Sequence, residues 1–254
     1  MKNKGLKSSF FYFIMLFCCF VFKINAQSTP VNYVGWYSYN GYHTLNDSNR
    51  LALLFEGTIQ RNNIVVEPMQ YAYRIGLSYQ FKNEDRIAGG YAFQYNFPYD
   101  AASKPYNTMN RRIWEQYTLR NTSSRFSHRF RLEQIWTQQK APPNYTATSE
   151  WKFENVFRYR INYLLPISKK LTADFNDEIF FNLSDLNSQK MFNQNRIYAG
   201  LLFNLDKEHI WKMNAGYMFQ AVWNTQESRE DRKRINNVLR ISVISDLSFS
   251  KNKN

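Results

Sequence analysis

The stretch YAYRIGLSYQF, Tyr71 to Phe81, sets apolar and polar side chains at alternate positions. One series is apolar and carries aromatic residues at both ends: Tyr71, Tyr73, Ile75, Leu77, Tyr79 and Phe81. The other series is small or polar with an arginine at its centre: Ala72, Arg74, Gly76, Ser78 and Gln80. Successive side chains of a strand point to opposite faces, so this alternation predicts a strand with one apolar face. A helix would need apolar residues every three or four positions.

The same alternation recurs along the chain and predicts an all-β protein. In IAGGYAFQYNF, for example, Ile87, Tyr91 and Phe93 share one face, and Ala88 and Gln94 share the other. Eleven such segments are expected at about 34–43, 50–61, 70–81, 86–97, 111–121, 126–139, 153–166, 171–183, 193–205, 211–224 and 235–249.

The connections between these segments are predicted to alternate in length. Short polar turns are expected at 46–49, 82–85, 122–125, 168–170 and 206–209. Longer loops are expected at 62–69, 98–110, 140–152, 184–192 and 225–234. An antiparallel meander with short turns on one side and longer loops on the other is typical of an outer-membrane barrel.

We therefore predict a closed, antiparallel, up-and-down transmembrane β-barrel of 10–12 strands, with the apolar series facing lipid and the polar series facing the lumen. Closure is expected because only a closed sheet satisfies its backbone groups in lipid. Aromatic residues at both strand ends suit the two membrane interfaces. An odd count of eleven would leave the first and last strands parallel. The alternative is a soluble, lipocalin-like barrel, whose small interior the many large aromatic residues would overfill.

Two carboxylates break the pattern of the apolar faces. Glu115 and Asp177 both fall in series that are otherwise apolar. A β-bulge or a position beyond the membrane edge would explain each of them.

The first residues predict export. Lys2, Lys4 and Lys7 precede an apolar run from Phe10 to Phe22, which is short for a membrane-spanning helix. We interpret residues 1–26 as a cleaved signal peptide, with an uncleaved anchor as the alternative, and residues 27–254 as a single barrel domain. The expected location is the outer membrane of a Gram-negative bacterium.

Both cysteines of the sequence, Cys18 and Cys19, lie inside this signal. The exported chain would then have no disulfide, no catalytic thiol and no cysteine metal site. The formal net charge of +13 is compatible with nucleic acid or an anionic membrane surface. For an exported protein we expect membrane lipids and, during biogenesis, the barrel-assembly machinery as partners, and no nucleic acid.

Several short motifs resemble a known family: WYS at 36–38, RIWEQ at 112–116, FRLEQ at 130–134, NRIYAG at 195–200 and GYMFQ at 216–220. With the eleven-segment layout, the chain resembles the exported Gram-negative proteins grouped as domain of unknown function 2490. The resemblance covers nearly the whole exported chain. It implies an outer-membrane β-barrel with no established activity and no catalytic residues to transfer.

Charged residues on the inward series form the main candidate site. Those expected in the lumen are Glu56, Arg74, Arg129, Arg131, Glu133, Glu154, Arg158, Arg160, Glu178, Arg196 and Arg240. One interpretation is a network of ion pairs that stiffens a small barrel, since a charge away from water needs a partner. The other is an arginine-lined path that favours anions. The two are compatible if arginines exceed acids.

Enzymatic chemistry has less support. His43, His128 and His209 are the histidines of the chain, and adjacent Ser127 and His128 would face opposite sides of a strand. We therefore predict no catalytic residues, no metal site and no cofactor. The loop carboxylates Asp100, Glu227, Glu230 and Asp231 are interpreted as solvating charges.

The sequence thus predicts an outer-membrane barrel that acts as a narrow pore or as a structural membrane component, with small solutes or anions as candidate ligands. Two alternatives remain open. One is a lipid-modifying outer-membrane enzyme. The other is a surface binding protein that uses the loops at 98–110 and 140–152.

Overall fold

The computed structural model describes residues 31–45, 50–99, 105–120, 125–141, 144, 146–185, 191–223 and 233–249. The proposed signal peptide, the turn at 46–49, most of the turn at 122–125 and most of the loop at 225–234 lie outside the described residues. So do Asp100, Glu227, Glu230 and Asp231.

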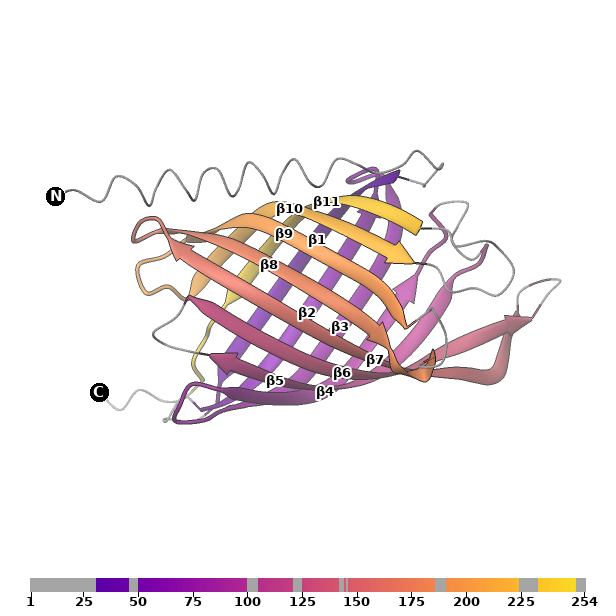
Figure 1. Cartoon of the computed structure of the whole chain (residues 1–254), viewed down its shortest axis with the longest axis horizontal. Helices are drawn as coiled ribbons and strands as arrows, with labels where there is room; N and C mark the ends of the chain where they lie inside the picture. The colour runs from indigo at the N-terminus through magenta and orange to yellow at the C-terminus, as the bar shows by residue number, and fades with distance from the viewer. Residues whose placement is uncertain are drawn as a thin grey trace.

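The described residues form one closed barrel of eleven strands (Figure 1). The strands are β1 (Val31–Thr44), β2 (Leu51–Asn62), β3 (Glu67–Gln80), β4 (Arg86–Asn96), β5 (Thr108–Arg120), β6 (Phe126–Ala141), β7 (Thr146–Pro166), β8 (Leu171–Asn182), β9 (Phe192–Asn204), β10 (Trp211–Trp223) and β11 (Lys233–Ser245). Each strand pairs with its neighbour in the chain, and β1 pairs with β11 to close the sheet. The predicted all-β closed barrel of 10–12 strands is confirmed.

The pair that closes the barrel differs from all the others. β1 and β11 run parallel, in register from Val31–Ile235 to Gly41–Ser245. Every other neighbouring pair of strands is antiparallel. The expectation of a fully antiparallel sheet therefore fails at one seam, because an odd number of strands in a meander must bring two strands of the same direction together.

The alternation predicted for the opening stretch is confirmed in β3. Ile75 is 50% exposed on the outer face, whereas Ser78 is 3% exposed on the inner face. The outer face is rich in exposed aliphatic and aromatic residues along all parts of the barrel, among them Phe55, Tyr91 and Tyr217. The outer face is thus mainly apolar, whereas the interior holds many buried polar side chains.

Two of the long-loop predictions are wrong. The connection expected at 62–69 is a tight turn between Asn62 and Glu67, with Asn63 and Ile64 both at positive φ. The connection expected at 140–152 is largely strand, because β6 and β7 continue as a hairpin that projects beyond the other strands (Figure 1). The strict alternation of short and long connections therefore does not hold.

The remaining connections fit the prediction better. The turns after β3, β7 and β9 are short, and Tyr99 lies in a long connection between β4 and β5. A short 3₁₀ helix, η1 (Leu183–Asp185), follows β8. In the part of the chain that the structure covers, no helix has the length and apolar character needed to cross a membrane.

The two carboxylates on the outer face lie in regular strands. No register shift occurs beside Glu115 in β5 or beside Asp177 in β8, so the proposed bulges are wrong. Glu115 is exposed, and Asp177 accepts a hydrogen bond of 2.6 Å from the amide of Asn195 on β9.

Glycines on the inner wall make room for a large ring. Trp114 is 1% exposed, and its ring lies over Gly76. A Cβ atom added to Gly76 would approach the Trp114 ring to 2.5 Å, and one added to Gly90 would approach the Cα of Gly76 to the same distance. The glycines in this part of the sequence therefore serve close packing inside the barrel.

Candidate functional site

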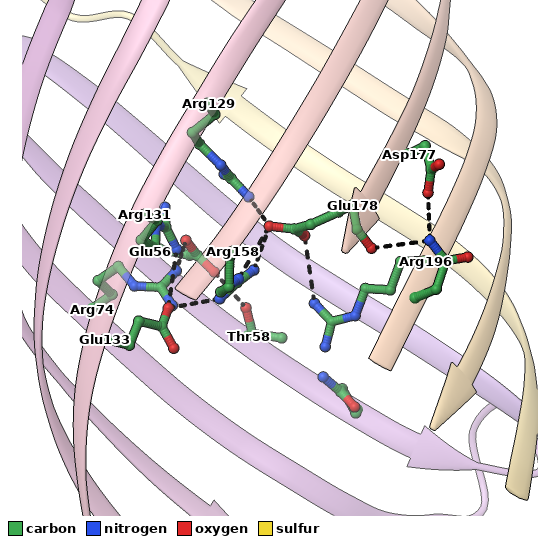
Figure 2. A network of polar contacts seen from close by, with 12 residues as sticks. Glu56, Thr58, Arg74, Arg129, Arg131, Glu133, Arg158, Asp177, Glu178 and Arg196 are labelled. Atoms are coloured by element: carbon green, nitrogen blue, oxygen red, sulfur yellow. Dashed lines mark hydrogen bonds and ion pairs between the residues drawn. The ribbon is translucent and has the colours of Figure 1, made fainter. Parts of the chain in front are cut away.

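A network of charged side chains crosses the barrel interior (Figure 2). Its members come from β2, β3 and β5 on one side and from β6, β7, β8 and β9 on the other. Each occupies an inward position of its strand, because strand side chains alternate between the two faces. Side chains from both halves of the sheet therefore meet inside the barrel.

Glu133 is the most deeply buried member, at 1% exposure. Its Oε1 lies 2.6 Å from Nη1 of Arg158 and 3.5 Å from Nη1 of Arg131. Its Oε2 accepts a hydrogen bond of 2.9 Å from Arg112, and Arg74 approaches Oε1 to 3.6 Å. One carboxylate thus has four guanidinium groups around it.

Glu178 on β8 is the second centre of the network. Its Oε1 accepts hydrogen bonds from Arg129 and from Nε and Nη2 of Arg158, the latter two at 3.1 and 2.9 Å. Its Oε2 lies 3.9 Å from Nη1 of Arg196. Arg158 therefore joins Glu133 to Glu178 and links the two halves of the network.

The strand register places like charges side by side. Arg129 lies directly opposite Arg160, and Arg131 lies directly opposite Arg158, in the β6–β7 pair. Like charges at directly opposite positions destabilise a sheet. Glu133 and Glu178 offset this repulsion for Arg131, Arg158 and Arg129, whose guanidinium groups they contact.

The predicted lumen residues are not all joined in this way. Glu56 pairs with Arg74 at 2.5 Å. Glu154 stands apart, because it pairs with Lys152 of its own strand at 3.2 Å, toward the long-loop end. Among the described residues, Arg160 and Arg240 make no ion pair with a carboxylate, and the Nε of each has no acceptor from the protein.

Aromatic rings support several of the guanidinium groups. Arg131 lies over the ring of Trp114, with 5.2 Å between its Cζ and the ring centroid. Arg158 and Arg196 both lie over Phe180, at 4.4 and 4.7 Å. Such contacts stabilise a cation where water is scarce.

Two members of this arrangement were missed in the sequence. Arg112 donates a hydrogen bond to Glu133, and the guanidinium groups of Arg74 and Arg131 lie over the ring of Trp114. Arg112 and Trp114 lie on the inward face of β5, whereas Glu115 lies on its outward face. The alternation of that segment identifies them once Glu115 is placed on the outer face.

Two cavities adjoin the network, one on each side. The loop-end vestibule has a volume of about 460 Å³ and reaches from Gln60, Asn96 and Tyr106 down to Glu133. The arginine chamber has a volume of about 230 Å³ and lies toward the short-turn end. Its lining includes Ser38, Asn40, Arg74, Arg129, Arg131, Arg158, Arg160, Asn176, Glu178, Arg196 and Arg240. Trp36, Glu56, Arg74, Arg158 and Arg196 border both cavities.

Carboxamide side chains line the loop-end vestibule. Gln60 donates to Gln70 at 2.8 Å, and Gln70 donates to Asn96 at 2.8 Å. On the opposite wall, Asn236 donates to Gln220 at 2.9 Å. These amides satisfy one another across neighbouring strands and give this part of the wall a polar surface.

An apolar cluster fills part of the interior beside the network. It consists of Val34, Met69, Tyr198, Met218 and Val238, with Trp36 and Tyr99 packed against it. The hydroxyl of Tyr198 donates to Asn214, whose amide donates to Asp174 at 2.6 Å. The lumen is thus occupied by side chains over much of its cross-section.

The histidines do not assemble a catalytic group. His128 bonds the hydroxyl of Tyr159 at 2.8 Å, while Ser127 belongs to the inward series of the same strand. His43 lies 3.3 Å from the hydroxyl of Tyr39, and His209 lies in the turn before β10. No group of three or more His, Cys, Asp or Glu side chains is placed to hold a metal ion within the described ranges.

Comparison with known proteins gives one relationship. A search of the curated proteins and a search of the solved structures each found no match. Residues 34–231 match the model of a family described as protein of unknown function, DUF2490. This span runs from β1 to the connection before β11 and includes the residues of Figure 2. The chain therefore belongs to the DUF2490 family.

Proposed function

We propose that this protein is an outer-membrane barrel whose lumen forms a narrow path for small anions. In the resting state, the network of ion pairs around Arg158 closes this path. The observation that carries the proposal is the excess of arginines over acids around the two cavities. The arginines are Arg74, Arg112, Arg129, Arg131, Arg158, Arg160, Arg196, Arg234 and Arg240. The glutamates are Glu56, Glu133, Glu154 and Glu178.

The membrane part of the proposal rests on the outer face. Its exposed residues are apolar along β3, from Tyr73 to Tyr79, and carry aromatic rings near both ends of that strand. Strands of this length cross a bilayer when tilted, and interfacial aromatic residues suit the headgroup level. The basic and apolar first residues of the sequence support export.

The anion preference follows from the net charge of the lumen. A ring of guanidinium groups lowers the energy of an anion in a narrow passage and raises that of a cation. The ion pairs of Glu133 and Glu178 also fill the passage, so we expect a small conductance. The competing function, a purely structural barrel, would use the same ion pairs to stiffen the wall and pass no ions.

Planar-bilayer recordings under a potassium chloride gradient test the proposal. We expect small currents whose reversal potential shows anion selectivity. Arg160→Gln and Arg240→Gln should each reduce that selectivity, whereas Arg111→Gln, on the outer face over Trp151, should leave it unchanged. A large, cation-selective current would contradict the proposal. Silence of the folded native protein over the whole range of applied voltage would favour the structural function.

The location is tested separately by fractionation. The exported protein should sediment with outer membranes and migrate faster on a gel when it is not heated, since folded outer-membrane barrels stay compact in detergent. Recovery from the soluble periplasm would exclude the membrane proposal.

A further inference from the structure

The lining of the arginine chamber contains more arginines than carboxylates. It is a cavity of about 230 Å³ toward the short-turn end of the barrel, on the far side of the network from the loop-end vestibule. Arg129, Arg131, Arg160 and Arg240 all border it, and Glu56 and Glu178 are the acidic residues in its lining.

The carboxylate groups beside the chamber already form ion pairs with other arginines. Oε1 of Glu178 receives Arg129 and Arg158, and Oε2 lies 3.9 Å from Arg196. Glu56 pairs with Arg74. Arg160 is directly opposite Glu178 in the β7–β8 register, yet forms no ion pair with it. The acids of the chamber therefore form their ion pairs with other arginines and none with Arg160.

Arg240 is in a similar position on the opposite wall. Its guanidinium lies over the ring of Tyr198 at 5.0 Å, a contact that leaves the edge of the guanidinium group free to donate. Neither Arg160 nor Arg240 has a protein acceptor for its Nε. A guanidinium group carries five N–H donors and does not lose its proton in proteins.

Neutral groups complete the lining. Ser38, on β1, bonds Ser242 at 2.7 Å and receives the amide of Asn40 at 3.2 Å. Asn176 enters from β8. Since a water molecule occupies about 30 Å³ of liquid, the chamber has room for a group of several non-hydrogen atoms.

We propose that the arginine chamber is a binding site for one small oxyanion, with Arg160 and Arg240 as its principal donors and Asn176 as a neutral one. Charge-assisted hydrogen bonds to phosphate, sulfate or carboxylate oxygens are about twice as strong as neutral ones, and the planar guanidinium fork matches these groups. Bound there, the anion neutralises the repulsion between Arg129 and Arg160. The site deepens the proposed function by naming the class of anion, and rests on it only for the route of entry.

The test uses the folded barrel in detergent, where binding is measured without any current. Inorganic phosphate is titrated at constant ionic strength against sodium chloride, with calorimetry and the thermal unfolding midpoint as readouts. We expect saturable binding that raises the midpoint in the native protein and in the control Arg111→Gln. Arg160→Gln and Arg240→Gln should each weaken binding roughly tenfold or more. Arg160→Lys keeps the charge and should weaken it less.

A second signature separates binding from a structural role. Without phosphate, Arg160→Gln should unfold at a higher temperature than the native protein, because it removes the repulsion with Arg129. With phosphate, the order should reverse. Sulfate and acetate series then distinguish a tetrahedral oxyanion from a carboxylate, and either result supports the site. An effect of phosphate no larger than that of chloride, or equal binding by Arg160→Gln, would overturn it. If the native protein binds phosphate but conducts no ions, the proposed function is refuted and the binding site is not.

Discussion

Arg129 and Arg160 occupy directly opposite positions in the β6–β7 pair, so two guanidinium groups share one level of the barrel interior. Glu178 contacts the first and makes no ion pair with the second. Its carboxylate is already contacted by Arg129, Arg158 and Arg196. The interior is therefore held together by a limited number of acids, and its stability depends on each of them.

Glu133→Gln should destabilise the barrel strongly. The substitution keeps the shape of the side chain but removes the charge that Arg158 and Arg112 contact at 2.6 and 2.9 Å. Breaking one side of a buried ion pair costs about 3–5 kcal/mol, because the remaining charges are left uncompensated. Urea-dependent unfolding in lipid vesicles, followed by gel mobility, measures the loss.

The matched control for Glu133→Gln is Glu208→Gln in the exposed turn before β10, which should change stability by less than about 0.5 kcal/mol. The double variant Glu133→Gln with Arg158→Gln should be less destabilised than the sum of the single variants, because the two residues are directly coupled. Additive losses would show that the pair does not interact.

Ile75→Arg should block assembly, because Ile75 is exposed on the apolar outer face of β3. An arginine at the middle of a bilayer destabilises an outer-membrane barrel by about 2–4 kcal/mol. The control is Gln94→Arg on β4, which points into the loop-end vestibule. Folding yield in vesicles should fall for the first variant and change little for the second. Equal yields would mean that the outer face does not contact lipid.

Gly76→Ala should impair folding, because the added methyl group would meet the ring of Trp114 at 2.5 Å and a backbone oxygen at the same distance. Neither neighbour moves easily in a packed barrel, and overpacking typically costs about 1–3 kcal/mol. Gly57→Ala is the control, since no atom lies within 4 Å of the position that its methyl group would take. Tryptophan fluorescence and the unfolding midpoint report the difference. A neutral Gly76→Ala would place the Trp114 ring elsewhere.

We expect the turn around Asp85 to lose structure locally in acid. Its carboxylate, in the turn between β3 and β4, receives the backbone amide of Arg120 at 3.0 Å and the hydroxyl of Tyr117 at 2.8 Å. These hydrogen bonds, the one from Arg120 foremost, hold the pKa of Asp85 below its ordinary value of 3.8. The stabilisation is therefore complete above pH 3.8 and is lost as the pH falls through the lowered pKa.

Hydrogen exchange at the Arg120 amide should reveal this loss, with protection that declines in acid below the ordinary range of an aspartate. Asp85→Asn should remove the pH dependence of that protection. Glu208→Gln, in another short turn, should not alter it. Protection of Arg120 that stays constant into strong acid would contradict the role of Asp85.

Much of the barrel could be predicted because strand alternation is a local signal. Ile75 and Ser78 face outward and inward as their positions in the series require, and all eleven predicted segments correspond to strands. The inward positions of Arg129 and Arg158 follow from the same rule. Alternation identifies a face but not a partner, so the convergence of Arg74, Arg112, Arg131 and Arg158 on Glu133 could not be predicted.

The loops were harder to predict, because their conformations are ones that their residue types seldom adopt. Asn63 and Ile64 form a tight turn at positive φ, a conformation uncommon for a β-branched residue such as Ile64. Pro68 is an unusual residue within a strand, yet it sits in β3 where the β2–β3 register shifts, a place that tolerates a missing N–H donor. Glu154 was grouped with the network by its face, but its height along β7 places it with Lys152 instead.

The parallel seam has a consequence for how the two ends of the barrel lie relative to a membrane. β1 begins at Val31 on the long-loop rim, and β11 ends at Ser245 on the short-turn rim. In the proposed membrane-spanning arrangement, fluorophores or epitopes attached just before Val31 and just after Ser245 should therefore report from opposite compartments. An even-stranded meander would hold both on one side. The closing contacts, such as Asn32 with Asn236, join positions 204 residues apart, so the barrel can seal only after its last strand has entered the sheet.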